Sequence, residues 1–129
     1  MEALIPAIWS KAAREQLKPA GAISNLEREV LRGRARLWSA NNGELLIVTR
    51  LEVVNGHREF VIVAAAGRGL NRASRAIYNL AQAANASVIR FHTFNPKPLA
   101  NTMQYWPIYL TEIRRGLFRT EYVYKLEVK

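Results

Sequence analysis

The sequence predicts an α/β (α+β) fold: a mixed, mostly antiparallel sheet with two N-terminal helices and one central crossover helix. Three observations lead to it. Apolar residues recur at helical spacing before residue 31, Asn55-Gly56 separates two strand-like runs, and residues 59–94 have the pattern of strand, helix and strand. Asn-Gly favours a tight antiparallel hairpin, whereas strand–helix–strand favours a right-handed parallel crossover. The 129 residues suit one domain over 1–129.

Two helices are expected before the first long strand. Residues 4–17 place their apolar side chains on one helical stripe, which the Lys18-Pro19-Ala20-Gly21 segment ends. A second helix is expected over residues 24–31, because Ser24 and Glu27 have the spacing of a capping box. Gly33 then suits the end of that helix.

The later elements follow from runs of apolar residues and from the turns between them. Residues 59–66 are nearly all apolar after the first, which suits a central strand buried on both faces. The remaining elements are expected in this order: strands at 34–38 and 44–54, a helix at 71–86, a strand at 87–94, a short helix at 99–105 and a final strand at 117–128.

Composition excludes several classes of protein. The chain has no Cys, which excludes disulfide scaffolds, thiolate metal sites and Cys nucleophiles. It has no Asp and two His, so no metal site and no Ser-His-Asp triad is expected. No apolar run approaches the ~18 residues of a membrane span, and the N-terminus lacks the charged region of a secretory signal.

The net charge of +9 is unevenly distributed. Residues 1–59 carry nine cations and seven acids, a balance of +2, whereas residues 60–129 carry ten cations and three acids, a balance of +7. A positive field of this kind attracts nucleic acid, acidic proteins, anionic lipid or phosphorylated cofactors. Solubility alone is the alternative explanation.

The sharpest candidate site is the glycine-broken segment between the central strand and the long helix. Glycines and the free amides of a helix N-terminus form a site for anions. The arginines there oppose the helix dipole, so either a bound anion or acidic partners balance them; a solvated face is the alternative. The candidate anion-binding residues are Gly67, Arg68, Gly69, Asn71, Arg72 and Arg75.

The order of elements around this loop resembles the GNAT fold of acyl-CoA N-acyltransferases. The segments LIPAIW (4–9), GRARLW (33–38) and LLIVTRLE (45–52) further resemble short GNAT-like proteins of tailed bacteriophages. In working GNAT enzymes the loop begins with Arg or Gln, continues with two residues, Gly and one residue, and ends with Gly or Ala. Ala64 or Ala66 would occupy the leading position here, so the motif departs from the family's pattern. The resemblance implies acetyl-CoA as a possible cofactor.

The same resemblance implies a Glu near the central strand as base and a Tyr late in the chain as acid. Glu59 and either Tyr105 or Tyr109 are the nearest matches, although a Glu that opens a strand is more often a solvated strand end and a Tyr in an apolar segment more often a core or interface residue. Two further arginine clusters could follow phosphates or protect a sheet edge. They are Arg32, Arg34 and Arg36, which would share one face of a strand, and Arg114, Arg115 and Arg119.

These observations predict a bacteriophage-type structural or interaction protein that uses basic and aromatic surface to bind protein, copies of itself or nucleic acid. The alternatives are an acyl-CoA-dependent N-acetyltransferase and a nonspecific nucleic-acid-binding protein. We expect it in a virion or the host cytoplasm, neither secreted nor in a membrane. An open cleft between the strands that end at Ala66 and Phe94 would favour cofactor binding, and a filled one a structural role.

Overall fold

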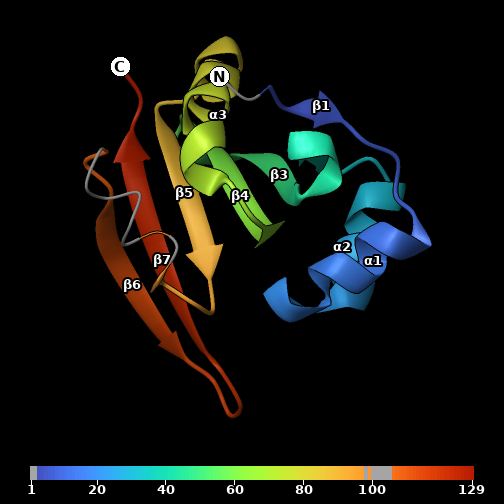
Figure 1. Cartoon of the computed structure of the whole chain (residues 1–129). Helices are drawn as coiled ribbons and strands as arrows, with labels where there is room; N and C mark the ends of the chain where they lie inside the picture. The colour runs from blue at the N-terminus through green and yellow to red at the C-terminus, as the bar shows by residue number, and fades with distance from the viewer. Residues whose placement is uncertain (1–2, 98, 100–105) are drawn as a thin grey trace.

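The computed structural model describes residues 3–97, 99 and 106–129 (Figure 1). Within them the strands form one seven-stranded sheet in the order β1-β2-β3-β4-β5-β7-β6. The elements are, in chain order, β1 (Ile5–Pro6), α1 (Lys11–Leu17), the 3-10 turn η1 (Lys18–Ala20), α2 (Ile23–Leu31), β2 (Arg36–Ala40), the 3-10 turn η2 (Asn41–Gly43), β3 (Leu45–Val54), β4 (His57–Gly67), α3 (Leu70–Ala83), β5 (Val88–Thr93), β6 (Tyr109–Arg115) and β7 (Thr120–Glu127).

The topology confirms the predicted mixed sheet. β4 and β5 pair in parallel through the α3 crossover, and the other neighbouring strands pair antiparallel. Asn55 and Gly56 turn β3 into β4 with positive φ values of 51° and 78°. That backbone conformation is why the Asn-Gly pair predicts this hairpin.

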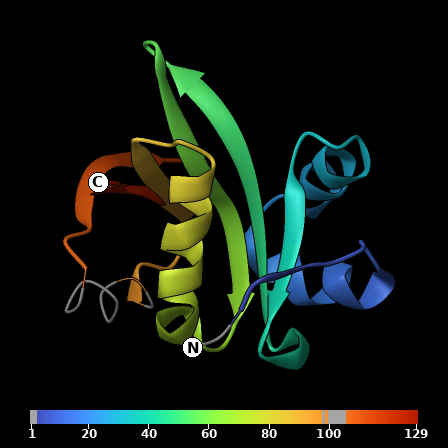
Figure 2. The same cartoon turned by 90° about the horizontal axis from the view of Figure 1, so that it is seen from above.

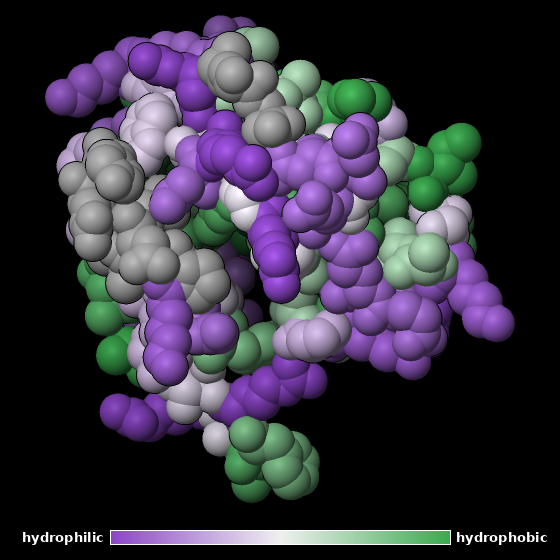
Figure 3. Space-filling view, in the orientation of Figure 1, coloured by the Kyte–Doolittle hydropathy of each residue, from purple (hydrophilic) through white to green (hydrophobic). Residues whose placement is uncertain are grey.

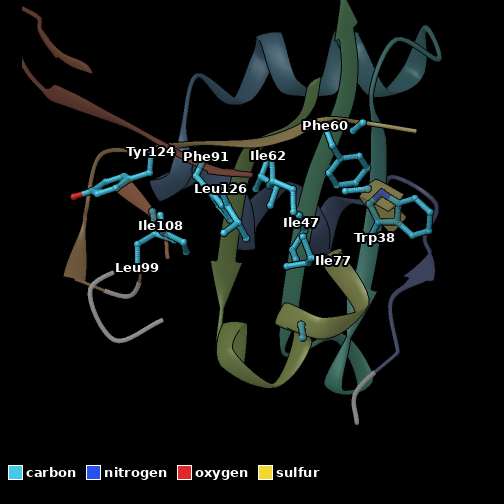
Figure 4. Close-up of a cluster of buried hydrophobic side chains, with 14 of the residues drawn as sticks. Trp38, Ile47, Phe60, Ile62, Ile77, Phe91, Leu99, Ile108, Tyr124 and Leu126 are labelled. Carbon is cyan, nitrogen blue, oxygen red and sulfur yellow. The ribbon is translucent and has the colours of Figure 1, made fainter. Parts of the chain in front are cut away.

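Helices cover the two faces of the sheet unequally (Figure 2). α3 packs on one face of the sheet with its buried residues Ala73, Ile77 and Ala81. The two alanines are small and let the helix approach the strands closely. That face holds the larger core, part of which Figure 4 shows. On the other face α1 and α2 cover β2, β3 and the second half of β4, where Leu17, Leu26 and neighbouring apolar residues form a second core.

The prediction of one helix over residues 4–17 is wrong at its start. Ile5 and Pro6 form β1, which pairs with Ser39 and Trp38 of β2, and α1 begins at Lys11. The hydroxyl of Ser10 caps α1 by accepting a hydrogen bond from the amide of Ala13 at 3.1 Å. Strand pairing with a distant segment therefore overrides the local helical pattern.

The predicted capping box of the second helix is also wrong. α2 begins at Ile23, its N-cap is Ala22, and no side chain caps it. The carboxylate of Glu27 instead accepts a hydrogen bond from the indole of Trp9 at 2.5 Å and lies 3.7 Å from Arg14. Glu27 thus ties α2 to the segment before α1.

Three other expectations need correction. The first predicted strand at 34–38 is observed at 36–40, so Arg32 is the C-cap of α2, and Arg32, Arg34 and Arg36 do not share a strand face. The sequence does not predict β6, whose seven residues are all exposed. The last strand begins at Thr120, because Leu117 and Phe118 lie in the β6–β7 turn and are each 96% exposed.

The short helix expected at 99–105 falls, beyond Leu99, outside the described residues. None of the described helices is both long and apolar enough to cross a membrane.

Candidate functional site

An extra residue in β4 separates β4 from β5. Along β3, Val48 pairs with Ala64 and Thr49 with Ile62, so Val63 is a β-bulge. A bulge bends its strand and increases the twist. The described β4–β5 ladder ends at the pair Ile62 and Phe91, immediately before the bulge. β4 then continues along β3, while β5 continues along β7.

The two diverging strand ends enclose a cavity of about 430 Å³, here called the β4–β5 cleft. In the orientation of Figure 1, the surface is hollowed near the centre, and hydrophilic side chains border the hollow above and on the right (Figure 3). The cleft between the strand ends at Ala66 and Phe94 is therefore open, which is the arrangement expected of a cofactor-binding protein. Its lining residues are Gln16, Pro19, Ala20, Ile62, Ala65, Ala66, Gly67, Leu70, Phe91, His92, Thr93, Phe94, Asn95, Leu99 and Arg119.

The glycine loop at the mouth of this cleft is held tightly against η2. Gly67 has φ +118°, and a Cβ atom there would stand 1.7 Å from the carbonyl oxygen of Glu44. Gly69 has φ +93°, and a Cβ atom there would stand 2.1 Å from Nδ2 of Asn41. The amide of Arg68 donates to Glu44 at 3.1 Å, and its carbonyl accepts from Asn41 at 3.0 Å. Both positions therefore require glycine.

The loop leads into the positive end of α3. Gly69 is the N-cap and no side chain caps the helix. The first hydrogen bond of the helix runs from the amide of Ala73 to the carbonyl of Gly69 at 3.1 Å, so the preceding amides lie outside the intrahelical ladder. Together with the helix dipole they attract an anion. The guanidinium of Arg72 folds back over this end, 3.1 Å from the Cβ position of Gly69.

The structure thus brings most of the predicted anion-binding residues together. Gly67, Arg68, Gly69, Asn71 and Arg72 lie consecutively around the loop and the first turn of α3. Arg75 lies one turn further along the helix, where its guanidinium is 5.9 Å from the centre of the Trp106 ring. Arg119, from the third predicted cluster, also reaches the cleft and lies 4.6 Å above the ring of Phe94.

Glu59 lies in a different environment from the one its expected role as base requires. Its side chain is only 7% exposed and lines neither of the two large cavities at this end of the sheet. One carboxylate oxygen accepts from Arg90 at 2.7 Å, and the other lies 3.6 Å from Lys125. In this arrangement Glu59 is a buried partner of two cations.

Tyr109 also lies away from both cavities. Its hydroxyl donates to Glu127 at 2.6 Å at the exposed start of β6. That hydrogen bond, more than burial, raises the pKa of Tyr109 above its ordinary value of 10.0. Tyr105 falls outside the described residues.

A second cavity of about 470 Å³ lies on the opposite side of β5, between the sheet and α2; we call it the α2 cavity. It shares Ala20, His92, Thr93 and Phe94 with the β4–β5 cleft, so the two cavities meet at the end of β5. Its other lining residues are Gly21, Ala22, Asn25, Leu26, Arg28, Glu29, Arg32, Arg34, Ala35, Val48, Arg50, Val63 and Glu121.

His92 is the one titratable residue among those four shared residues. Its Nε2 accepts from Nε of Arg90 at 2.9 Å, and its Nδ1 lies 3.3 Å from Glu121. Burial is the main reason that the pKa of His92 lies below its ordinary value of 6.5. The imidazole is therefore neutral at neutral pH and its proton is on Nδ1, facing Glu121.

Arg90 connects this histidine to the acidic residues of the sheet. Its guanidinium donates to Glu59 and Glu52, each at 2.7 Å, as well as to His92. Burial raises the pKa of Glu52, but the hydrogen bonds and charges of Arg90 and Arg50 outweigh it and leave that pKa below 4.5. Sequence analysis missed the pair of His92 and Glu121, whose one local signal is a histidine at the carboxyl end of the strand after the crossover.

No metal centre is evident in the described part of the chain, where no three His, Cys, Asp or Glu residues are placed to hold an ion.

Comparisons with known proteins bear on the fold. An acetyltransferase of Bacillus subtilis in complex with CoA superposes with a TM-score of 0.73 at 13% identity, and each chain is covered completely. A GNAT-family acetyltransferase of Elizabethkingia anophelis with acetyl-CoA bound gives 0.74 at 14% identity, over 98% of this chain and 97% of that one. The fold is that of the GNAT acetyltransferases.

A third solved structure with this fold is FeeM, an N-acyl amino acid synthase from uncultured soil microbes. It has a TM-score of 0.71 and 10% identity, and the match covers 99% of this chain and 91% of FeeM. No family model and no curated protein matches the chain. The GNAT part of the sequence resemblance is therefore confirmed as a fold.

Proposed function

We propose that the protein is an acyl-CoA-dependent N-acyltransferase whose β4–β5 cleft binds the acyl-CoA and whose α2 cavity takes the amine. The observation that carries this proposal is the cleft itself. The bulge at Val63 opens it directly beside the glycine loop and the positive end of α3. Two solved structures with this fold hold CoA or acetyl-CoA.

The residues at the loop fit a pyrophosphate group. Gly67 and Gly69 let the backbone turn tightly against η2 and enter α3, whose first amides point along the helix dipole. In the register that places Gly67 and Gly69 on the GNAT motif, its leading Arg or Gln would fall on Ala64, which is 1% exposed and pairs with Val48. Arg72, folded over Gly69, supplies a cation at this place instead.

A bound acyl thioester supplies the carbonyl carbon, at which a C–N bond to the amine forms while the C–S bond to CoA breaks. The attacking amine loses a proton in this reaction. His92, neutral and placed where the two cavities meet, takes that proton at Nε2, directly or through a water, once Nε2 has exchanged its hydrogen bond from Arg90 for the amine or the water. Glu121, beside Nδ1, stabilises the imidazolium that results. Glu59 holds Arg90, which orients His92, so Glu59 is a positioning residue in this proposal.

Calorimetric titration with acetyl-CoA tests the proposal. We expect saturable binding by the native chain and at least about tenfold weaker binding by Arg72→Ala, because charge-assisted hydrogen bonds to phosphate are lost. Arg115→Ala is the matched control, since Arg115 is exposed on β6 and belongs neither to the glycine loop nor to α3, where Arg72 lies. An absence of binding at millimolar acetyl-CoA would overturn the proposal.

One feature favours a second function, that of an interaction protein. Leu117 and Phe118 project from the β6–β7 turn with 96% of each side chain exposed, and β6 is an exposed edge strand. Exposed apolar groups of this kind mark contact surfaces. The bacteriophage, virion and nucleic-acid parts of this function stay predictions. Sedimentation of the native chain and of Leu117→Ser/Phe118→Ser tests it: association that the double variant abolishes supports an interaction surface at the turn.

A further inference from the structure

The charges around the α2 cavity are strongly unbalanced. Four arginines line it, three of them from the end of α2 and the residues that follow. Two acids line it as well, and the one histidine is neutral. The four arginines are Arg28, Arg32, Arg34 and Arg50.

Both acids already have partners, Glu121 in Arg114 outside the cavity and Glu29 in two of the four cavity arginines. Glu121 lies 3.3 Å from Arg114 and 3.3 Å from Nδ1 of His92. Glu29 lies 3.8 Å from Arg34 and 4.0 Å from Arg50. Among the described residues, no salt bridge involves Arg28 or Arg32. The excess positive charge is therefore greatest at the α2 end of the cavity.

Helix stability explains only part of this arrangement. Cations near a helix C-terminus interact favourably with the dipole, and Arg28 and Arg32 lie in the last turn and at the C-cap of α2. Arg34 and Arg50 do not belong to that helix, yet they line the same cavity. Arginines from two segments of the fold thus line one open cavity.

The size and contacts of this space point to a small anionic ligand. A cavity of about 470 Å³ is within the range of small-molecule sites. The planar guanidinium donates pairs of hydrogen bonds that match a carboxylate or a phosphate. The opposite end of the cavity meets the β4–β5 cleft at His92.

We infer that the amine acceptor is a small molecule that also carries an anionic group, a carboxylate or a phosphate. Arg28 and Arg32, with Arg34 and Arg50, hold the anion at the α2 end, and the amino group lies toward His92. This inference rests on the proposed acyltransferase function for the direction of the amine. The anion site itself depends only on the cavity and its arginines.

Rates of CoA release with paired acceptors test the substrate class. Tyrosine, glutamate and phosphoethanolamine retain the anion, tyrosinamide is the partner of tyrosine without it, and spermidine is a cationic acceptor. We expect kcat/KM to be at least about tenfold higher for tyrosine than for tyrosinamide, and spermidine to be the poorest. A higher kcat/KM for glutamate than for phosphoethanolamine would indicate a carboxylate site, and the reverse order a phosphate site. Equal use of tyrosine and tyrosinamide, or preference for spermidine, would overturn the inference.

Variants locate the anion site. Arg28→Ala/Arg32→Ala should raise the KM for the anionic acceptor tyrosine at least about tenfold. The KM of the same variant for tyrosinamide should change little. Both side chains are exposed, so the fold is expected to be retained. Arg115→Ala, which removes one positive charge against two in the double variant, controls for the loss of an exposed arginine. An unchanged preference for the anionic acceptor in the double variant would contradict the assignment.

Direct titration with N-acetyltyrosine separates this inference from the proposed function. Arginine-dependent binding of N-acetyltyrosine without any binding of acetyl-CoA would retain the anion site and exclude acyl transfer. Binding of acetyl-CoA, with neither N-acetyltyrosine binding nor a preference for anionic acceptors, would retain the transferase and exclude the anion site.

Discussion

Substitution of Gly67 by Ala gives the sharpest test of how the glycine loop is held. The new Cβ atom would lie 1.7 Å from the carbonyl oxygen of Glu44, where at least 3.0 Å is needed. The loop and η2 must therefore separate by about 1.3 Å, the difference between these two distances. This shift breaks the 3.1 Å hydrogen bond from the amide of Arg68 to Glu44.

Two costs add up in this variant. A residue with a side chain at φ +118° costs about 1 kcal/mol or more. The lost hydrogen bond and the displaced backbone cost about 2 kcal/mol further. Gly43→Ala is the matched control, because Gly43 also has a positive φ, +90°, but nothing lies within 4 Å of its Cβ position. We expect free energies of unfolding lower by about 3 kcal/mol for Gly67→Ala and about 1 kcal/mol for Gly43→Ala.

Urea denaturation followed by circular dichroism measures both values. With a slope of about 2 kcal/mol/M, the two variants should differ by about 1 M in their midpoints. Acetyl-CoA titration of folded Gly67→Ala should also show weaker binding, because the loop has moved at the mouth of the cleft. Equal midpoints for the two variants would refute the reasoning, since the φ cost alone would then explain both.

Three further predictions use the same denaturation measurement. Arg90→Met should lower the free energy of unfolding by about 3 kcal/mol, because it removes the closest cation of the buried Glu59, whereas Arg115→Met should have almost no effect. Burial lowers the pKa of His92 in the folded chain, so the unfolded chain binds this proton more readily below pH 6.5. Stability should therefore fall as the pH drops below 6.5, and less steeply in His92→Gln; identical slopes would contradict this. Phe118→Ser should change the free energy of unfolding by less than about 0.5 kcal/mol, because the side chain is 96% exposed.

Features determined by neighbouring residues were predictable from the sequence. Asn55 and Gly56 adopt positive φ values readily, so the pair predicts a hairpin by itself. The apolar run at 59–66 likewise predicts a strand buried on both faces. The glycine loop was also found, since Gly67 and Gly69 interrupt that run. These signals do not depend on which segment packs against them.

Features determined by distant residues were not predictable. Residues 4–9 have a helical pattern, but Ile5 pairs with Ser39 of β2 and so lies in a strand. The carboxylate of Glu27, which a capping box would use, accepts a hydrogen bond from the indole of Trp9 instead. β6 faces no core, so it has no periodic apolar face to detect. The contact between His92 and Glu121 joins residues that are 29 positions apart, and only the sheet register brings them together.

The bulge at Val63 has a consequence for how the binding space tolerates change. The β4–β5 cleft exists because one inserted residue ends strand pairing, so its shape depends on backbone register more than on side-chain volume. Side chains can then diverge widely while the space persists, which fits chains of 10–14% identity that share this fold. Deletion of the single residue Val63 would instead make β4 a regular strand, because Ile62 and Ala64 already pair with the consecutive residues Thr49 and Val48, and the two strands could then continue to pair. Insertions and deletions, more than substitutions, are therefore the changes that would abolish this site.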